Sequence, residues 1–519
     1  MPLHGAALDR PFELSAVLRH GCETKPDDAA LVSAGRRWTW RELERTSDHY
    51  AANLIGLGLE PGDRVASLMP NRIALLLHYL GCAKAGLVVT PLNYRYMPPE
   101  IDHALEGSGA AMLLAHAERD RDVAASKLAS SLRLGVVRYG ASDGRQPSFE
   151  ALLDQGPHGI ALDAPDPTAP AAIFFTSGST GPAKGVTHSF DTLGWMVASA
   201  ARAFQFTPSD IVLPGSSISH VGGFLFSLAA LSVGARVLVA HTFDPDEVLS
   251  LLREDRPTVL CMLPAALFAV VRDHGAARAD FASLRLCRSG SDKVPLELER
   301  EFTELTGLAI DEGYGCTETG LVTLNPPSGT IKLGSIGRAN PGYALSVRSE
   351  DGVELPPDRE GRLWIRSPSN MIGYWNQPDA TAETVKGGWL DSGDLMRADV
   401  DGYLWFCGRK KQIIVHDGSN ICPQEVEDAL LEHPAVESAG VVGIHDVVHG
   451  ETVRAYVTLR ADARRPTAQE LIRFARGRVG YKAPETIMVL EEMPLNPTGK
   501  VDRVTLKRMA EERVGGGPG

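Results

Sequence analysis

The stretch Thr176-Ser-Gly-Ser-Thr-Gly-Pro-Ala-Lys-Gly185 directly follows an apolar run at residues 171–175. Its glycines and small residues expose backbone N–H groups that can surround a polyphosphate, and Lys184 adds positive charge. It differs from a Walker A loop because no Ser or Thr follows the lysine. The alternative is a flexible surface loop. Because an apolar strand leads straight into this stretch, we predict a phosphate-binding loop.

Three later segments place polar residues in glycine turns or beside prolines. In Asp311-Glu-Gly-Tyr-Gly-Cys-Thr-Glu-Thr319, Thr317 offers a hydroxyl for phosphate and Glu318 a carboxylate for Mg²⁺. A capped helix start explains the same two residues equally well. Asp391-Ser-Gly-Asp394 offers a carboxylate for a ribose diol or simply forms a turn, and Pro494-Leu-Asn-Pro-Thr-Gly-Lys500 ends in a lysine.

Apolar runs alternate with segments of helical period, which is typical of βαβ units around parallel sheets. We expect strands at 64–70, 87–91, 210–213, 236–239, 259–262 and 284–288, with helices at 72–85 and 224–231. After about residue 340 shorter strands and turns follow, at 346–348, 361–366 and 402–406. A last part of the chain predicts helices at 425–431 and 468–478 and strands at 436–444 and 453–459. The fold class is therefore α/β, with a small α+β unit at the C-terminal end.

Composition excludes several classes of protein. The chain has 519 residues and a formal net charge of −13, which favours two or more domains and argues against nucleic acid or anionic membrane as a partner. Its seven cysteines are an odd number without a C-x-x-C pair, so neither a disulfide framework nor a zinc site is expected. No signal peptide and no transmembrane span is expected, and we predict a cytoplasmic protein.

Together, and in this order, these segments resemble the acyl-adenylate-forming superfamily, which comprises acyl-CoA synthetases, firefly luciferases and peptide-synthetase adenylation domains. The resemblance is closest to the acyl-CoA synthetases and covers about residues 10–512. It implies a large N-terminal domain of mixed sheets flanked by helices, at 1–407, and a small mobile C-terminal domain at 408–519. It also implies ATP-dependent formation of acyl-AMP and pyrophosphate, followed by transfer of the acyl group to coenzyme A.

The resemblance assigns roles residue by residue. It gives the ATP-binding positions as Thr176, Ser177, Gly178, Ser179, Thr180, Gly181, Lys184, Gly290, Ser291, Glu312, Gly313, Tyr314, Asp394 and Arg409. It gives the catalytic positions as Lys500, His220, Thr317 and Glu318, with Glu318 also holding Mg²⁺. It places the hinge at Lys411, a thiolation loop at Asp417 and Gly418, and the acyl pocket at Val221 and Phe224.

The sequence departs from the family pattern after the hinge, where Asp417 stands at a position that is commonly glycine. A carboxylate there would crowd the approach of the thiol and raise the thiol pKa. Alternatively, aspartate tolerates the left-handed backbone that glycine often adopts, and the loop is unaltered. The efficiency of acyl transfer to coenzyme A therefore depends on whether Asp417 crowds the thiol or leaves the loop unaltered.

The segment around His220 bears on the acid substrate. Residues 214–231 contain no Asp or Glu, so an α-ammonium group would be buried without a partner and an amino acid is not expected. The apolar residues of this segment favour an apolar acid, whose chain length or ring system the sequence does not give. Three alternatives to a CoA ligase stay open: adenylation alone with transfer to a partner protein, a luciferase-like oxygenase, and a non-catalytic nucleotide-binding protein.

Overall fold

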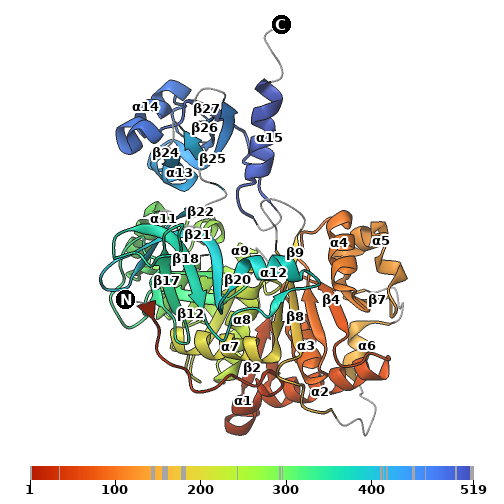
Figure 1. Cartoon of the computed structure of the whole chain (residues 1–519). Helices are drawn as coiled ribbons and strands as arrows, with labels where there is room; N and C mark the ends of the chain where they lie inside the picture. Colours follow the sequence, from red (N-terminus) through yellow and green to blue (C-terminus); the bar gives the residue numbers. More distant parts are fainter. Residues whose placement is uncertain are drawn as a thin grey trace. The chain divides into compact units, whose positions relative to one another are not determined.

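The computed structural model describes residues 3–33, 35–141, 147–154, 162–176, 183–241, 244–290, 294, 296–409, 412, 414–416, 419–446, 450–461, 463–496 and 499–514 (Figure 1). The chain divides into two compact units. Unit 1 comprises Met1–Val294, Leu298–Leu345 and Ile365–Leu390. Unit 2 comprises Pro295–Glu297, Ser346–Trp364 and Asp391–Gly519. The domain boundary at 407/408 stays a prediction.

Unit 1 contains a seven-stranded sheet among its described residues. Its order is β19 (Gly373–Tyr374), β9 (Lys184–Ser189), β8 (Pro170–Thr176), β5 (Val88–Pro91), β4 (Arg64–Leu68), β6 (Met112–His116) and β7 (Val136–Tyr139). The strands from β8 to β7 pair in parallel, whereas β9 and β19 add antiparallel edges. The expected strands at 64–70 and 87–91 are confirmed as β4 and β5. Their nearly continuous apolar sequence fits a parallel sheet that is covered on both faces.

A nine-stranded sheet also lies in the described part of unit 1. Its order is β16 (Arg338–Ala339), β15 (Gly320–Leu324), β14 (Ile310–Cys316), β13 (Leu286–Gly290), β12 (Val259–Met262), β10 (Ile211–Gly215), β11 (Arg236–Leu238), β2 (Ala29–Ser33) and β3 (Arg36–Thr39). The strand expected at 259–262 is confirmed. The strand expected at 284–288 is observed as β13, which begins and ends two residues later. It continues past 288 because Ser289 pairs with both β12 and β14, and Gly290 pairs with β14, despite the low β propensity of serine and glycine.

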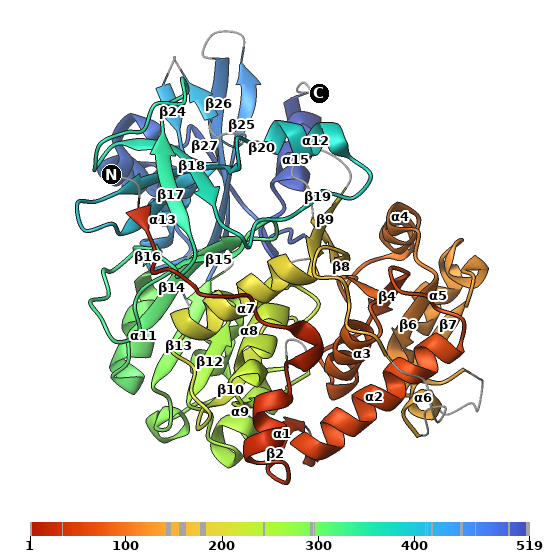
Figure 2. The same ribbon diagram turned by 60° about the horizontal axis from the view of Figure 1, so that its bottom comes forward.

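Helices cover the two sheets, and their bounds follow recognisable local signals. The α2 helix (Trp40–Gly56) begins with a capping box between Thr39 and Glu42 and lies along α3 (Ile73–Lys84), as Figure 2 shows. The α8 helix (Val221–Ser232) starts three residues before the expected 224, and its Gly223 is required because a Cβ there would lie 2.3 Å from the Ser217 oxygen. The other helices assigned wholly or mainly to unit 1 are α1 (Arg19–Thr24), α4 (Pro98–Ser108), α5 (Asp120–Ala125), α6 (Phe149–Asp154), α7 (Phe190–Ala203), α9 (Pro245–Glu254), α10 (Pro264–Phe268), α11 (Leu296–Thr306) and α12 (Pro378–Thr384).

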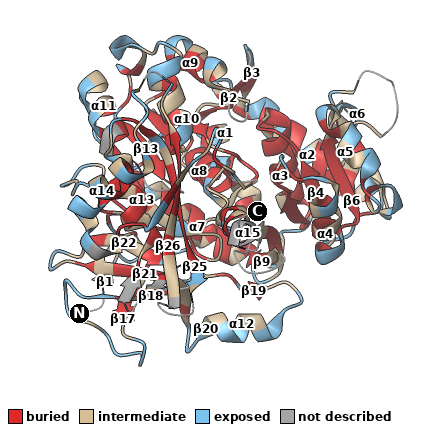
Figure 3. Ribbon diagram, turned by 90° about the horizontal axis from the view of Figure 1, so that it is seen from above, coloured by how far each residue is buried: buried red, intermediate tan, exposed pale blue. Residues whose placement is uncertain are grey.

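Two hydrophobic clusters of unit 1 lie on opposite faces of the nine-stranded sheet. One face packs with α3, α7 and α8 and includes Val259 and Leu286. The other face packs with α9 and α11 and includes Cys287 and Ile310. Figure 3 shows the strands mostly buried and the outer faces of α9 and α11 exposed. Alternating residues of one strand therefore meet different helices, which matters for the site described below.

A further sheet, of six strands among the described residues, carries the predicted ribose-binding segment. Its order is β1 (Leu3–His4), β17 (Ala344–Arg348), β18 (Glu360–Arg366), β21 (Trp389–Ala398) and β20 (Val385–Lys386), and β22 (Leu404–Arg409) pairs with β21. The short strands expected at 346–348 and 361–366 are confirmed within β17 and β18. The strand expected at 402–406 begins at 404, because Gly402 has a φ of +83° and closes the preceding turn.

The C-terminal part of unit 2 is a small α+β structure. Its described strands are β23 (Ile414–His416), β24 (Ser419–Ile421), β25 (Val436–Asp446), β26 (Gly450–Leu459) and β27 (Thr486–Val489). Its helices are α13 (Pro423–Leu431), α14 (Ala468–Val479) and α15 (Arg503–Val514). The helices and strands expected between 425 and 478 are confirmed, whereas β27 and α15 have no counterpart in the prediction. Within the described residues, every helix is too short or too polar to cross a membrane.

Candidate active site

The predicted phosphate loop joins the antiparallel strands β8 and β9. Thr176, at the end of β8, lies in register with Lys184 at the start of β9, and its hydroxyl donates to the Lys184 carbonyl oxygen at 3.4 Å. The sheet therefore fixes both ends of the loop. The predicted positions Ser177, Gly178, Ser179, Thr180 and Gly181 lie outside the described residues.

Thr317 and Glu318 lie in the turn between β14 and β15. Cys316 pairs with Gly320 across this turn, and Gly320 has a φ of +76°. The alternative of a capped helix start is wrong, because the glycine lets the chain reverse at once into an antiparallel strand. The turn places a hydroxyl and a carboxylate on consecutive half-buried residues.

The imidazole of His188, on β9, holds this turn. Its Nε2 lies 2.8 Å from the Thr317 carbonyl oxygen, and its Nδ1 lies 3.2 Å from the Thr192 hydroxyl. Burial lowers the pKa of His188 to about 4, against the smaller raising effect of the Thr317 contact. The imidazole is therefore neutral at pH 7, donates from Nε2 and accepts at Nδ1. This hydrogen bond joins the seven-stranded sheet to the nine-stranded sheet.

Tyr374, on β19, connects the exit of the phosphate loop with the same turn. Its hydroxyl donates to Glu318 Oε1 at 2.9 Å, and the Lys184 Nζ lies 4.8 Å from the centre of its ring. Burial, followed by the neighbouring Glu318 carboxylate, raises the pKa of Tyr374, so it stays a neutral donor. One side chain thus contacts the lysine and the carboxylate that the sequence assigns to phosphate and metal.

The backbone around Tyr374 strengthens this connection. The Met371 N–H donates to the Glu318 carbonyl oxygen at 2.7 Å, and the Trp375 N–H donates to the Gly185 carbonyl oxygen at 2.7 Å. Sequence reasoning missed both Tyr374 and His188 as site residues. The available signal for Tyr374 was a pair of aromatic residues directly after Gly373; His188 carried no signal of its own.

The residues predicted to border adenine lie at the carboxyl ends of two parallel strands. Gly290 of β13 and Gly313 of β14 are in register. A Cβ on Gly313 would lie 2.6 Å from a backbone oxygen of β15, so the strands approach too closely for a side chain. Glu312 is buried and Tyr314 is half-buried on the same strand. Ser291 lies outside the described residues.

The residues predicted for the acid begin α8. His220 immediately precedes the helix, and its Nε2 lies 3.5 Å from the Asn93 Nδ2. Val221 is half-buried and Phe224 is buried. The geometry therefore puts the histidine and the apolar residues on adjoining turns at one end of this helix.

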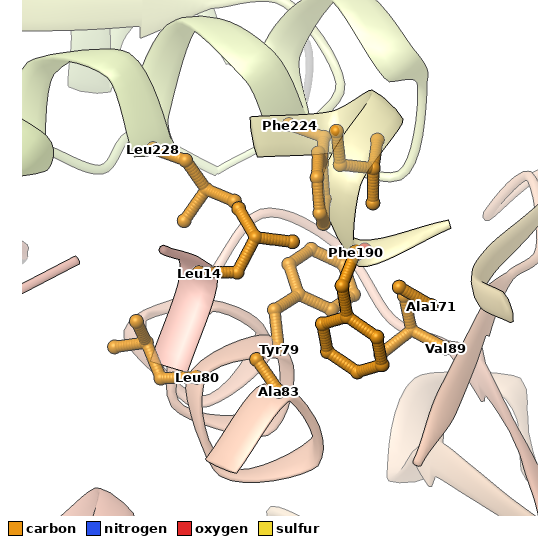
Figure 4. A pocket seen from close by; sticks show the side chains of 10 residues that line it. Leu14, Tyr79, Leu80, Ala83, Val89, Ala171, Phe190, Phe224 and Leu228 are labelled. Carbon is orange, nitrogen blue, oxygen red and sulfur yellow. The ribbon is translucent and has the colours of Figure 1, made fainter. Parts of the chain in front are cut away.

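Phe224 also borders a small apolar cavity (Figure 4). The cavity has a volume of about 20 Å³, and its lining includes Leu14, Tyr79, Val89, Phe190 and Leu228. The Phe224 ring centroid lies 4.9 Å from that of Tyr79, so the wall is tightly packed. A space of this size holds about one water and no acyl chain. The role of Phe224 in acid binding stays a prediction.

The predicted ribose-binding pair belongs to unit 2. Asp394 of β21 and Arg409 of β22 are in register, and the Arg409 Nε lies 2.9 Å from Asp394 Oδ1. Asp394 is 1% exposed, whereas half of the Arg409 side chain is exposed. The buried carboxylate is therefore held by an exposed guanidinium. The predicted hinge residue Lys411 and the thiolation-loop residues Asp417 and Gly418 lie outside the described residues.

Lys500, also in unit 2, lies in a tight hairpin before α15. Its N–H donates to Asn496 Oδ1 at 3.1 Å, and its carbonyl oxygen accepts from the Asn496 N–H at 2.8 Å. Leu495 and Val501 form an antiparallel bridge, and Gly499 has a φ of +82°. Asn496 thus holds the backbone of Lys500 at two points: its side chain accepts from the Lys500 N–H, and its own N–H donates to the Lys500 carbonyl oxygen.

Comparison with known proteins agrees with this geometry. Residues 18–375 match the family described as AMP-binding enzyme, and residues 425–500 match the AMP-binding enzyme C-terminal domain. The chain belongs to the AMP-binding enzyme family. The first match covers more than half of the chain and spans the phosphate loop, the Thr317–Glu318 turn and Tyr374, whereas the second ends at Lys500.

Relatives of this AMP-binding enzyme align over nearly its whole length. It is 33% identical over 489 residues to a feruloyl-CoA synthase of an Amycolatopsis species, covering 93% of this chain and 96% of the relative. It is 32% identical over 493 residues to the fatty acid–[acyl-carrier-protein] ligase ScoC of Streptomyces coeruleorubidus, covering 93% of each. Its fold superposes on ATP-bound MatB from Rhodopseudomonas palustris with a TM-score of 0.89 and 28% identity, covering 97% of this chain and 99% of MatB. These comparisons confirm the fold class.

Acidification should destabilise unit 1 through His188. Its ordinary pKa is 6.5 and its folded pKa is about 4, so between these values the unfolded chain binds a proton that the folded protein does not. The free energy of unfolding should therefore fall as pH drops below 6.5, by about 1.4 kcal/mol per pH unit for this residue. Urea unfolding at pH 7.5, 6 and 5 should show a smaller loss for His188→Gln than for the wild type. The exposed His20→Gln variant is the control, and equal losses for all three proteins would contradict the assignment.

The Tyr374→Phe variant should weaken ATP-dependent chemistry without unfolding the protein. It removes one hydrogen bond to the Glu318 carboxylate and leaves the ring beside Lys184. We expect kcat/KM for pyrophosphate release to fall about three- to tenfold, with a larger loss at low Mg²⁺. Tyr139→Phe, another half-buried tyrosine at the end of β7, should have no effect. A Tyr374→Phe enzyme with wild-type kcat/KM at every Mg²⁺ concentration would show that Glu318 needs no such support.

Proposed function

We propose that this AMP-binding enzyme is an acid–CoA ligase, which activates a carboxylic acid with ATP and transfers the acyl group to coenzyme A. The observation that carries the proposal is the arrangement around Tyr374. One tyrosine contacts both Lys184, at the exit of the phosphate loop, and Glu318, in the turn after β14. Cation and carboxylate held together in this way suit a nucleotide triphosphate with its divalent ion.

The donor set around Glu318 fits Mg²⁺. Mg²⁺ is commonly bound by one or two carboxylates together with phosphate oxygens of the nucleotide, which suits the single carboxylate of Glu318. Glu318 would hold the ion, and its Oε1 is oriented by the Tyr374 hydroxyl. When bound, Mg²⁺ neutralises negative charge on the phosphates. His188 and Met371 keep the turn in place through its two carbonyl oxygens.

The chemistry needs positioning and charge rather than an enzyme nucleophile. A carboxylate is a poor electrophile because its leaving group would be oxide, whereas acyl-AMP releases a stable phosphate ester. The acid carboxylate attacks the α-phosphorus of ATP, and pyrophosphate leaves; a thiol then attacks the acyl carbon, and AMP leaves. The first step brings two anions together, so we assign Lys184 and Lys500 to offset their repulsion. Asp394 is assigned to the ribose hydroxyls.

The acid is proposed to be largely apolar. Among residues 214–231, at the end of β10 and along α8, no Asp or Glu is present to pair with an ammonium group. Val221 and Phe224 supply apolar surface beside His220. The feruloyl-CoA synthase relative, by its name, acts with coenzyme A. This supports coenzyme A as the acceptor here.

Pyrophosphate release with a panel of carboxylic acids, measured with and without coenzyme A, tests the proposal. A CoA ligase releases pyrophosphate, AMP and acyl-CoA in equal amounts over many turnovers. Retention of acyl-AMP in the presence of coenzyme A would favour the alternative, adenylation with transfer to a partner protein, a possibility consistent with the resemblance to ScoC. Acid-independent ATP binding without pyrophosphate release would contradict both. The effect of Asp417 on the thiol step stays a prediction that the same assay addresses.

Replacing Lys500 by alanine separates the two half-reactions. We expect acyl-AMP formation to fall by orders of magnitude, because the ammonium group that faces the two anions is removed. Thioester formation from supplied acyl-AMP should stay within about twofold of the wild type. In this half-reaction no carboxylate has to approach the phosphates of ATP, so the repulsion that Lys500 offsets is absent. Lys507→Ala, on α15 of the same unit, is the control. Equal losses in both half-reactions would make Lys500 a structural residue of its hairpin.

A further inference from the structure

A row of three residues crosses the nine-stranded sheet on the neighbouring parallel strands β12, β13 and β14. Cys261 of β12 is in register with Arg288 of β13, which is in register with Asp311 of β14. Cys261 packs in the core that contains α8, as do Val259 and Leu286. Because side chains alternate along a strand, Arg288 and Asp311 face the same side as these residues.

The two charged residues of this row carry buried polar atoms that have no hydrogen-bond partner among the described residues. Asp311 is 1% exposed, and neither of its carboxylate oxygens has a hydrogen-bond partner. The Arg288 Nε is also buried without a partner, and its Nη1 has only the Cys261 sulfur at 3.6 Å. No ion pair joins them in the described part of the chain. Buried polar groups are normally satisfied, so this pair calls for a partner beyond those that the described residues supply.

The row lies next to the candidate active site. On the same face, the next position of each strand is a glycine, Gly290 after Arg288 and Gly313 after Asp311. A Cβ on Gly290 would lie only 2.9 Å from the Arg288 Nη2, so the guanidinium extends toward the end of the strand. Ligands of open α/β sheets bind outside the carboxyl ends of the strands. The distal end of an acid bound outside these strand ends, on the face that carries α8, would approach Arg288 and Asp311.

We propose that Arg288 and Asp311 select an acid that carries a hydroxyl group at its far end. This inference rests on the proposed function. A hydroxyl accepts a hydrogen bond from the guanidinium and donates one to the carboxylate. A second carboxylate on the substrate is repelled by Asp311, and an ammonium group is repelled by Arg288. An unsubstituted end leaves the Asp311 carboxylate and the Arg288 Nε buried without partners, which disfavours its binding.

The state of the Asp311 carboxyl is compatible with this selection. Burial raises its pKa to about 7, so near neutral pH both protonation states are present. A hydroxyl can donate to the ionised form or accept from the protonated form, whereas an ammonium group serves only the first. Val221 and Phe224 remain apolar contacts for the rest of the acid, so the substrate is an apolar acid with one polar end.

Paired acids test the selection. We would measure kcat/KM for pyrophosphate release with 4-hydroxycinnamate, cinnamate and 4-(aminomethyl)cinnamate, whose alkylamine is protonated at neutral pH, and with 10-hydroxydecanoate, decanoate and decanedioate. In whichever series is activated, the hydroxy acid should exceed its unsubstituted and charged analogues by about tenfold or more. Asp311→Asn and Arg288→Met should each reduce this ratio to about twofold or less. The ratio of kcat/KM for the hydroxy acid to kcat/KM for an analogue does not depend on the fraction of folded enzyme, because the two acids are measured on one sample.

The matched control is Glu299→Gln. Glu299 is another buried carboxylate with an unpartnered oxygen, but it lies on α11, which packs on the opposite face of the sheet. This variant should keep the wild-type ratio. A wild-type ratio near one, or an unchanged ratio in both site variants, would overturn the selection and leave the ligase intact. Absence of pyrophosphate release with every acid would instead reject the proposed function, and the selection with it.

Discussion

The hydrogen bond from the buried His188 imidazole to the Thr317 carbonyl oxygen spans the two large sheets of unit 1. His188 belongs to the strand that leaves the phosphate loop, and Thr317 belongs to the turn that carries Glu318. Met371 and Tyr374, on the edge of the same sheet as His188, bind the backbone and side chain of Glu318. The relative position of the strand that carries Lys184 and the turn that carries Glu318 is therefore set by backbone hydrogen bonds and by buried side chains.

This arrangement explains why residues far apart in the sequence form one site. Each sheet is completed by antiparallel strands at one edge, β9 with β19 in one and β15 with β16 in the other. Parallel strands alone would end in separate loops, each fixed only by its own helix. The antiparallel edges turn the chain back on itself, so that a loop and a turn from different sheets are hydrogen-bonded to each other.

Much of the fold follows from the sequence because its strands are apolar runs of definite length, as at Val259–Met262. Prediction is poorer where pairing overrides composition. Polar Ser289 and Gly290 extend β13, and β19 has only two residues, whose pairing depends on β9. The motif residues of the site were identifiable because each group is contiguous. His188 and Tyr374 act through partners that lie far away in the sequence, so no local pattern marks them. Arg288 and Asp311 are brought side by side only by the pairing of β13 with β14.

The small void beside Phe224 has a mechanical consequence. Its walls are apolar side chains of Leu14 and of α3, α7, α8, β5 and β8, so water gains no hydrogen bonds by entering it. Unfolding eliminates such empty space, and compression favours whichever state occupies less volume. Hydrostatic pressure should therefore favour loss of the packing between these helices of unit 1. Substitution by a larger side chain that fills the void should make the unit less compressible.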